Sequence, residues 1–347
     1  MEAFLPFIGL AIVIVLVFDY TNGFHDASNI IASAIAARAM TPGQAVLVVA
    51  GFEFLGPLLG GTAVANTVGT LLDLSTIPKT DALLIVVSGL FAAVFWNFYT
   101  WWRGLPSSSS HALMGGLVGA TLVGIGSEPI AWGFTDLSQG RIHGFSKILL
   151  ALFISPILGF LLGFGLQRLT MFLLRAAPPS INRHLRNAQW LTTASLAFSH
   201  GANDAQKSMG VLTLILLLSG QIDSFRVPGW VMLFCASAMT AGALTGGWRI
   251  VRTLGFAIYK IRPIHALNAQ LSACGIIFAS SLLGAPVSTT HVVASSIMGI
   301  GASDRPKRVR WGTAWNILLT WLITIPGSAI IASASFLIVH YFFQSAQ

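Results

Sequence analysis

The sequence contains little charge. Asp, Glu, Lys and Arg make up 9% of its 347 residues, whereas hydrophobic residues make up 55% and the mean hydropathy is +0.79. Soluble domains carry roughly 25% charged residues, so this composition excludes an ordinary water-soluble protein. Residues 82–99, 148–166 and 229–246 contain no charged side chain over about the 20 residues that a membrane-spanning helix requires. The chain is therefore predicted to be an all-α polytopic membrane protein.

Cysteines and cofactor signatures are also scarce. The two cysteines, Cys235 and Cys274, lie in apolar runs and indicate neither a disulfide framework nor a metal site. We interpret them as small buried hydrophobic residues. No cofactor-binding motif is present, and we expect no cofactor. The net charge of +8 does not indicate nucleic-acid binding, because the basic residues gather in a few loops, as they do in the cytoplasmic loops of membrane proteins.

Apolar segments separated by loop charges predict about ten membrane crossings, several of them broken. They cover 4–37, 42–65, 82–101, 107–126 and 148–166 in the first half, and 191–218, 229–247, 264–283, 287–301 and 312–343 in the second. With the amino terminus placed outside, most of the 19 Lys and Arg residues fall in inside loops. Because cationic loops stay in the cytoplasm, we expect a multi-pass protein of the inner (plasma) membrane with both termini extracytoplasmic.

Two short motifs each occur twice at nearly the same spacing. The sequence at 23–27 (GFHDA) recurs 178 residues downstream as GANDA, and that at 106–111 (PSSSSH) recurs 180 residues downstream as PVSTTH. A shared offset of this kind indicates duplication. Because each half holds an odd number of crossings, the second half is inserted upside down. This predicts two inverted-topology repeats, residues 1–167 and 189–347, joined by a cytoplasmic linker at 168–188.

The first motif places a carboxylate inside an apolar segment. Asp26 and Asp204 would be costly against lipid, so each is expected to face the interior of the helix bundle, a partner or water. We expect the adjacent glycine to let the helix unwind, which would expose backbone carbonyls to a cation and amides to an anion. An aspartate that only caps a half-helix is the structural alternative.

The second motif joins a proline to a hydroxyl cluster and a histidine. Its hydroxyl residues are Ser107, Ser108, Ser109, Ser110, Ser288, Thr289 and Thr290. Proline ends the preceding helix, and hydroxyls and free amides at the start of the next helix form a site for an oxyanion such as phosphate or sulfate. The short apolar arms on either side suit a re-entrant hairpin whose tip reaches the middle of the membrane. Helix capping alone is the alternative, although it accounts for only one or two hydroxyls in each cluster.

Three further polar residues lie in apolar segments. Glu53 has no cation near it in the sequence, and Gln270 precedes the second hydroxyl cluster by one helix. Lys207 follows Asp204 by three residues, where the first copy of the motif has the neutral Asn29. We expect Lys207 to pair with Asp204 or with an anion, and the alternative is that its ammonium group reaches the membrane surface.

Taken in order, residues 22–29, 105–111, 200–207 and 286–291 resemble the signatures of the inorganic phosphate transporter (PiT) family in its short bacterial form. The resemblance covers essentially the whole chain. It implies alternating-access symport of phosphate, driven by sodium ions or protons. It also ties the positions of Asp26 and Asp204 to cation coupling and those of Ser108 and Ser288 to phosphate.

The same resemblance bears on the other polar residues. Glu53 matches a functional glutamate of the family, and Gln270 stands where some members have glutamate. Lys207 departs from the sodium-driven members that the chain otherwise resembles, because those members carry asparagine at this position in both halves. Since an ammonium group repels a sodium ion, proton coupling is favoured, and sodium coupling is the alternative.

These considerations define an expected site. The predicted substrate-binding residues are Ser107, Ser108, Ser109, Ser110, Gln206, Lys207, Gln270, Ser288, Thr289 and Thr290. The predicted ion-coupling residues are Asp26, Asn29, Glu53, His200, Asn203 and Asp204. The expected partners are inorganic phosphate, either free or as a complex with a divalent metal, co-transported H⁺ or Na⁺, and membrane lipid, with a homodimer left open. No nucleic acid and no resident metal are expected.

The sequence also bears on functions other than symport of phosphate. An intramembrane hydrolase would need a Ser–His–Asp triad, which is one asymmetric site and gains nothing from inverted duplication, so the protein is not expected to be an enzyme. An anion channel is disfavoured, because the two buried carboxylates would repel an anion that travelled without a balancing ion. A symporter of another oxyanion, such as sulfate, remains the nearest alternative.

Overall fold

The computed structural model describes residues 5–345, so the predicted start of the first span at Phe4 lies outside the described residues. The first half contains α1 (Leu5–Ala36), α2 (Pro42–Leu59), α3 (Ala63–Gly69), α4 (Lys79–Arg103), α5 (Ser109–Ile125), α6 (Phe134–Leu137) and α7 (Gly144–Leu173). The second half contains α8 (Ile181–Leu218), α9 (Gly229–Thr245), α10 (Trp248–Arg252), η2 (Thr253–Ala257), α11 (Pro263–Leu282), α12 (Thr289–Asp304), η3 (Pro306–Arg308) and α13 (Trp311–Ser345).

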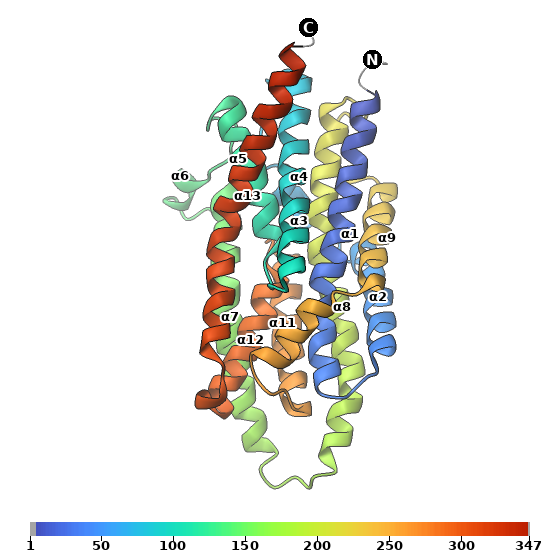
Figure 1. Cartoon of the computed structure of the whole chain (residues 1–347), viewed down its shortest axis with the longest axis vertical. Helices are drawn as coiled ribbons and strands as arrows, with labels where there is room; N and C mark the ends of the chain where they lie inside the picture. Colours follow the sequence, from blue (N-terminus) through green and yellow to red (C-terminus); the bar gives the residue numbers. More distant parts are fainter. Residues whose placement is uncertain (1–4, 346–347) are drawn as a thin grey trace.

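The same series of elements occurs twice. A long helix (α1, α8) is followed by a helix that breaks partway (α2–α3, α9–α10), a helical hairpin (α4–α5, α11–α12) and a final long helix (α7, α13). The halves interlock, because α5 packs along α13 and α12 along α7, while α2 packs on α8 and α9 on α1. Figure 1 shows the first hairpin in the upper part of the molecule and the second in the lower part. The predicted all-helical fold with two related halves is confirmed.

Length and apolarity identify the helices that can cross a membrane. Within residues 5–345, α1, α2, α4, α7 and α13 each qualify alone, and α9 with α10 forms a sixth candidate that bends by 59°. At 38 residues α8 is longer than any of them, but polar side chains lower its apolarity. The starts of α1 and α4 lie at the same end of the molecule as the end of α13 (Figure 1). The protein is a multi-pass membrane protein.

Four of the ten predicted crossings form the two hairpins. The arms α4 and α5 pack against each other, as do α11 and α12. The tips of the two hairpins touch, because the Ser110 hydroxyl donates to the Val287 carbonyl over 3.1 Å. The sequence predicted two full crossings at 82–101 and 107–126, but the loop between them is the tip of the first hairpin. Non-helical backbone is tolerated at this depth because it is buried in protein.

The helices that carry the aspartate motifs are unbroken. α1 continues through Asp26 and α8 through Asp204, so the expectation that glycine unwinds these helices is wrong. The breaks lie in the helices packed against them, at the glycine pairs 60–61 and 246–247, and one glycine of each pair has a positive φ. Glycine adopts this backbone conformation without the steric cost that other residues meet.

Glycine in the aspartate motifs permits close helix packing instead. A Cβ atom on Gly23 would lie 2.0 Å from the backbone oxygen of Met239 in α9, and one on Gly201 would lie 2.4 Å from that of Glu53 in α2. Small residues of this kind let membrane helices approach backbone to backbone. The two contacts are reciprocal, since each aspartate-bearing helix packs its glycine against the broken helix of the other half.

Replacing Gly23 with alanine is expected to destabilise the protein, because the added methyl group would overlap backbone atoms that cannot move aside as a flexible side chain would. The free energy of unfolding should fall by about 1–3 kcal/mol or more, the usual cost of overpacking. The matched control is Gly9→Ala on the same helix, where a Cβ meets no atom within 4 Å. Thermal unfolding in detergent measures both variants, and equal melting temperatures would contradict the packing role.

Candidate functional site

Two helix amino termini meet where the hairpin tips touch. Ser108 is the N-cap of α5 and its hydroxyl accepts from the His111 amide at 3.1 Å, while Ser288 is the N-cap of α12 and accepts from the His291 amide at 3.3 Å. The His111 and His291 rings lie 4.5 Å apart, so the two termini are close. The first amides of a helix have no acceptor within it and carry partial positive charge. Two such termini therefore converge on one interior region.

The capping geometry shows which hydroxyl of each motif holds the helix start. Ser108 and Ser288, at the positions tied to phosphate by resemblance, use their side chains as helix caps, as the structural alternative predicted. The hydroxyls that follow them, on Ser109, Thr289 and Thr290, reach the two aspartates instead. The cap and the polar contacts therefore belong to different residues of one motif.

Asp26 is surrounded by groups from both halves. Its Oδ1 accepts from the Thr290 hydroxyl at 2.8 Å and lies 2.8 Å from Nδ1 of His25, and its Oδ2 accepts from the Ser109 hydroxyl at 2.7 Å. The Asn29 amide donates to Thr290 at 2.8 Å and to Asp26 at 3.4 Å. α1 therefore contacts the tips of both hairpins through one carboxylate.

Asp204 has an equivalent set of neighbours in the other half. Its Oδ1 accepts from Nζ of Lys207 at 2.7 Å, and its Oδ2 accepts from the Thr289 hydroxyl at 3.4 Å. The Lys207 ammonium group also donates to the Ser110 hydroxyl and, at 2.9 Å, to the Val287 carbonyl. The prediction that Lys207 pairs with Asp204, and not with the membrane surface, agrees with these contacts and with its complete burial.

A histidine connects Asp204 to a third carboxylate. Nδ1 of His200 lies 2.6 Å from Oε1 of Glu53, and its Nε2 lies 3.4 Å from Oδ2 of Asp204. Glu53 lies on α2 and is fully buried, and its Oε2 has no hydrogen-bond partner. The polar partner that Glu53 lacked in the nearby sequence is thus supplied by α8, 147 residues downstream.

Sequence reasoning missed the role of His25 in this network. Its Nε2 lies 3.3 Å from the hydroxyls of both Thr100, at the end of α4, and Ser107, and these two hydroxyls are 2.8 Å apart. His25 therefore links Asp26 to the tip of the first hairpin. Its place beside the aspartate in the repeated motif was the available signal, but the contact with Thr100 depends on tertiary structure.

Three predicted site residues make no hydrogen bond with the side chains of the two aspartates. Two of them, Gln206 and Gln270, bind other parts of the helix bundle, and Asn203 supports the second hairpin tip. Gln206 accepts from the Val64 amide at 2.8 Å and donates to the Gly60 carbonyl, so it holds the break between α2 and α3 and does not face the tips. Gln270 bonds Thr192, Thr193 and Ser33, which joins α11 to α8 and α1. Asn203 supports the second tip, because it donates to the Ala285 carbonyl and accepts from the Val287 amide.

The cluster is closed to solvent on every side. No predicted site residue is more than 2% exposed. Each hairpin tip is held by a threonine from a broken helix, since Thr67 donates to the Gly284 carbonyl at 2.7 Å and Thr253 to the Gly104 carbonyl at 2.9 Å. Arg249 adds a hydrogen bond to the first tip. Access of solvent to the cluster therefore requires the surrounding helices to move.

The two aspartates and His200 together form a group that can bind a cation. Single ligand atoms of Asp26, His200 and Asp204 all lie within 4.8 Å of one another, and all three residues are buried. Carboxylate and imidazole ligands suit several divalent transition metals as well as protons. The centre of the molecule thus offers helix amino termini for an anion and carboxylates for a cation within the same enclosed region.

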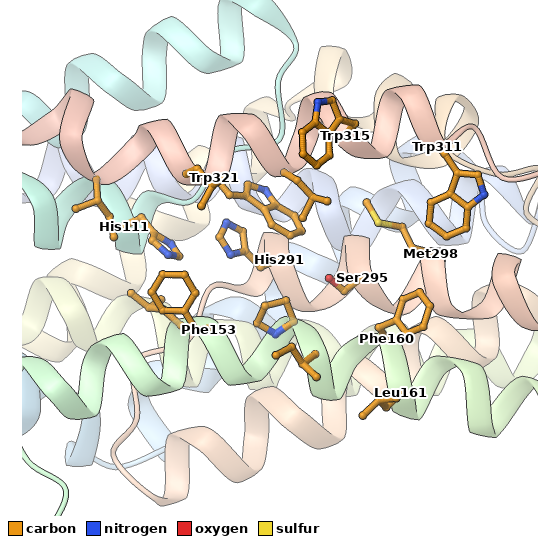
Figure 2. Close-up of a pocket in the computed structure, with 16 residues that line it drawn as sticks. His111, Phe153, Phe160, Leu161, His291, Ser295, Met298, Trp311, Trp315 and Trp321 are labelled. Carbon is orange, nitrogen blue, oxygen red and sulfur yellow. The ribbon is translucent and has the colours of Figure 1, made fainter. Parts of the chain in front are cut away.

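An apolar cavity lies beside the hairpin-tip histidines. It has a volume of about 600 Å³ and opens between α7 and α13. Figure 2 shows His111 and His291 at its inner side, with Trp321 beside them and Phe153 and Trp315 among the other lining residues. The Trp321 ring stacks on His291 at 3.8 Å. Because the lining offers almost no polar groups, this cavity suits lipid chains and not an inorganic anion.

The fold and the site define a class of protein: a multi-pass membrane transporter with two related halves around an enclosed polar centre. The model of the phosphate transporter family matches residues 22–182 and 174–332, and the chain belongs to this family. Probable low-affinity inorganic phosphate transporters are similar over 96% of the chain and 97% of their own length, with 39% identity in Bacillus subtilis (strain 168) and 40% in Rhizobium meliloti (strain 1021). Members of the family are transporters, so the protein is not an enzyme.

A solved structure has the same fold. The sodium-dependent phosphate transporter superposes with a TM-score of 0.83 over 97% of this chain and 99% of its own length, at 22% sequence identity. The arrangement of hairpins and broken helices is therefore shared well beyond the range of close sequence similarity.

Proposed function

We propose that this protein is a secondary active symporter of inorganic phosphate that works by alternating access and is coupled to protons. The observation that carries the proposal is the convergence of two capped helix amino termini between Asp26 and Asp204 in a closed interior. Helix amino termini bind phosphate through free amides and the helix dipole. The names of the two bacterial relatives support the same substrate.

The phosphate oxygens would be held by backbone amides and hydroxyls of the hairpin tips. Ser109, Ser110, Thr289 and Thr290 supply these groups, and the caps at the preceding serines fix the direction of both helices. Phosphate and the two carboxylates repel one another at this distance unless positive charge enters with the anion. Binding of phosphate and of the coupling ion is therefore mutually dependent, which is the requirement for symport.

Protons are the favoured coupling ion. The array of Glu53, His200 and Asp204 places a histidine between two carboxylates, an arrangement that can accept and pass on a proton. Lys207 supplies a fixed positive charge next to Asp204, which disfavours a sodium ion there. Sodium coupling at Asp26 is the alternative, and the fold shared with a sodium-dependent transporter is compatible with either ion.

The transport cycle would move the two halves relative to each other. In our proposal, residues 1–167 and 189–347 are the inverted repeats, and the linker at 168–188 faces the cytoplasm. The ends of this linker are helical, and its loop covers 174–180. Both termini are then extracytoplasmic in the inner membrane. Opening the contact of Thr67 with the second tip would expose the site to one side, and opening that of Thr253 with the first tip would expose it to the other.

A metal–phosphate complex is a second candidate substrate. The ligand atoms of Asp26, His200 and Asp204 lie close enough to bind one divalent cation next to the phosphate region. In that case the metal would be cargo, and its charge would offset that of the phosphate and the carboxylates.

Uptake of radiolabelled phosphate into proteoliposomes tests these proposals. A proton gradient imposed without sodium should drive accumulation, and a sodium gradient at equal pH should not. Adding Mg²⁺ or Ca²⁺ should raise uptake, with the metal entering in proportion, if the complex is the substrate. Strictly sodium-dependent uptake would refute proton coupling, and sulfate competing as well as phosphate would refute the substrate assignment.

A further inference from the structure

The polar centre contains two equivalent cation sites that differ at one position. Asp26 and Asn29 in α1 correspond to Asp204 and Lys207 in α8, at the same offset of 178 residues. Each aspartate accepts a hydrogen bond from the hairpin of its own half, from Ser109 at Asp26 and from Thr289 at Asp204. Each site is completed by a hydroxyl of the other half's hairpin, because Thr290 donates to Asp26 and Ser110 accepts from Lys207. The two sites are thus built alike, apart from the exchange of a neutral amide for an ammonium group.

The ammonium group of Lys207 lies where a bound monovalent cation would lie. Its Nζ is surrounded by a carboxylate oxygen of Asp204, the hydroxyl of Ser110 and the carbonyl of Val287. These are the oxygen ligands that membrane transporters offer to small cations. All three N–H donors of the ammonium group are used, and the side chain is fully buried. The second site is therefore occupied by a cation that the protein itself carries.

The first site has no such group. The amide of Asn29 donates to Thr290 and Asp26, but its Oδ1, fully buried, has no hydrogen-bond partner. A buried amide oxygen without a donor costs free energy unless a cation or a water molecule satisfies it. Asp26, Thr290 and Asn29 each have an oxygen atom in this site, His25 lies beside Asp26, and no lysine stands at the position that corresponds to Lys207.

We propose that Lys207 is a built-in cation that permanently fills the second of two equivalent cation sites, so that only the site at Asp26 exchanges an ion with water. This inference rests on the proposed symport and specifies its coupling. The Lys207 charge stabilises Asp204 and attracts phosphate but cannot be transported. Compared with a transporter that exchanges ions at both sites, this protein couples one cation fewer to each phosphate.

Replacing Lys207 with asparagine, the residue of the first site, tests the proposal. K207N should create a second exchangeable site, so that Na⁺ raises its melting temperature in detergent more than that of the wild type, because ligands that bind the native state stabilise it. Choline chloride at the same concentration controls for ionic strength. In proteoliposomes, Na⁺ should stimulate phosphate uptake by K207N several-fold more than by the wild type.

Three further variants separate a tethered cation from a structural clamp. K207M removes the charge without adding a ligand and should gain no response to Na⁺. N29K fills both sites and should lose the uptake that a proton gradient drives in the wild type, because neither site is then left to exchange an ion. The double variant N29K/K207N exchanges the two sites at constant charge, so Na⁺ should raise its melting temperature no more than that of the wild type. This variant also covers the case in which K207N alone does not fold.

The outcomes distinguish this inference from the proposed function. Equal Na⁺-dependent shifts in melting temperature for the wild type, K207N and K207M would overturn the inference, as would undiminished proton-driven uptake by N29K. Neither result would affect phosphate symport by the wild type. If the wild type took up no phosphate under any imposed gradient, the proposed function would fail, and the melting temperatures would still report on the two cation sites.

Discussion

Replacing Asp26 with asparagine is expected to abolish phosphate uptake while the protein remains folded. Asp26 is a single carboxylate that accepts hydrogen bonds from both hairpin tips and lies in the site proposed to exchange the coupling ion. Hydrogen bonds to a charged group contribute about 1.5–3 kcal/mol each, and every ~1.4 kcal/mol changes an equilibrium constant about tenfold. Because two such bonds are weakened, the rate of uptake should fall roughly a hundredfold or more. Initial rates in proteoliposomes, normalised to reconstituted protein, measure the effect.

The control for this substitution lies on the same helix. Asp19 is also fully buried, but it accepts a hydrogen bond from Ser208 in α8 and does not contact the hairpin tips. Asp19→Asn should therefore preserve most of the uptake. If both variants lost transport equally, the loss would reflect a general need for buried carboxylates, and the specific role of Asp26 would be refuted.

Replacing Glu53 with alanine should both destabilise the protein and inactivate it. Glu53 in α2 is the partner of His200 in α8, and His200 also contacts Asp204. Removing one member of a buried pair leaves the other without a partner, which typically costs about 3–5 kcal/mol. Glu53→Gln should cost less, because the amide oxygen can still accept from the histidine ring. Thermal unfolding in detergent measures stability, and uptake measures function.

A double-mutant cycle shows whether the destabilisation comes from this pair. The variant that replaces both Glu53 and His200 with alanine should be less destabilised than the sum of the two single variants, because neither polar group is then left alone. Additive costs would mean that the two residues do not interact as the structure describes. Loss of uptake in the double variant is expected in either case, since the array next to Asp204 is gone.

Much of the fold could be predicted from the sequence. The repeated offset marked the duplication, and the apolar segments marked the helices, because both depend on patterns that are local or periodic along the chain. The pairing of hairpin arms was harder to predict. An apolar stretch of about 20 residues can cross the membrane or turn back inside it, and its length does not distinguish the two cases.

The site residues divide in the same way. Asp26, Asp204 and Lys207 lie at the centre, as predicted from the cost of charge at membrane depth. Gln206 belongs to the same short motif, yet it caps the break before α3, because its side chain points to a different neighbour of α8. A motif fixes which residues are adjacent along a helix, but the packing of that helix decides which element each side chain meets.

By itself, the sequence determined that the chain is a duplicated, all-helical membrane protein with acidic and hydroxyl residues buried in each half. These properties follow from composition and repetition. Only the tertiary structure decided that α1 and α8 remain continuous, that Ser108 and Ser288 are caps, and that Lys207 occupies a site equivalent to that of Asn29. The two cation sites could not be predicted because each is completed by a hydroxyl of the opposite half, far away in the chain. The serine caps are local contacts, for which the sequence left two interpretations open.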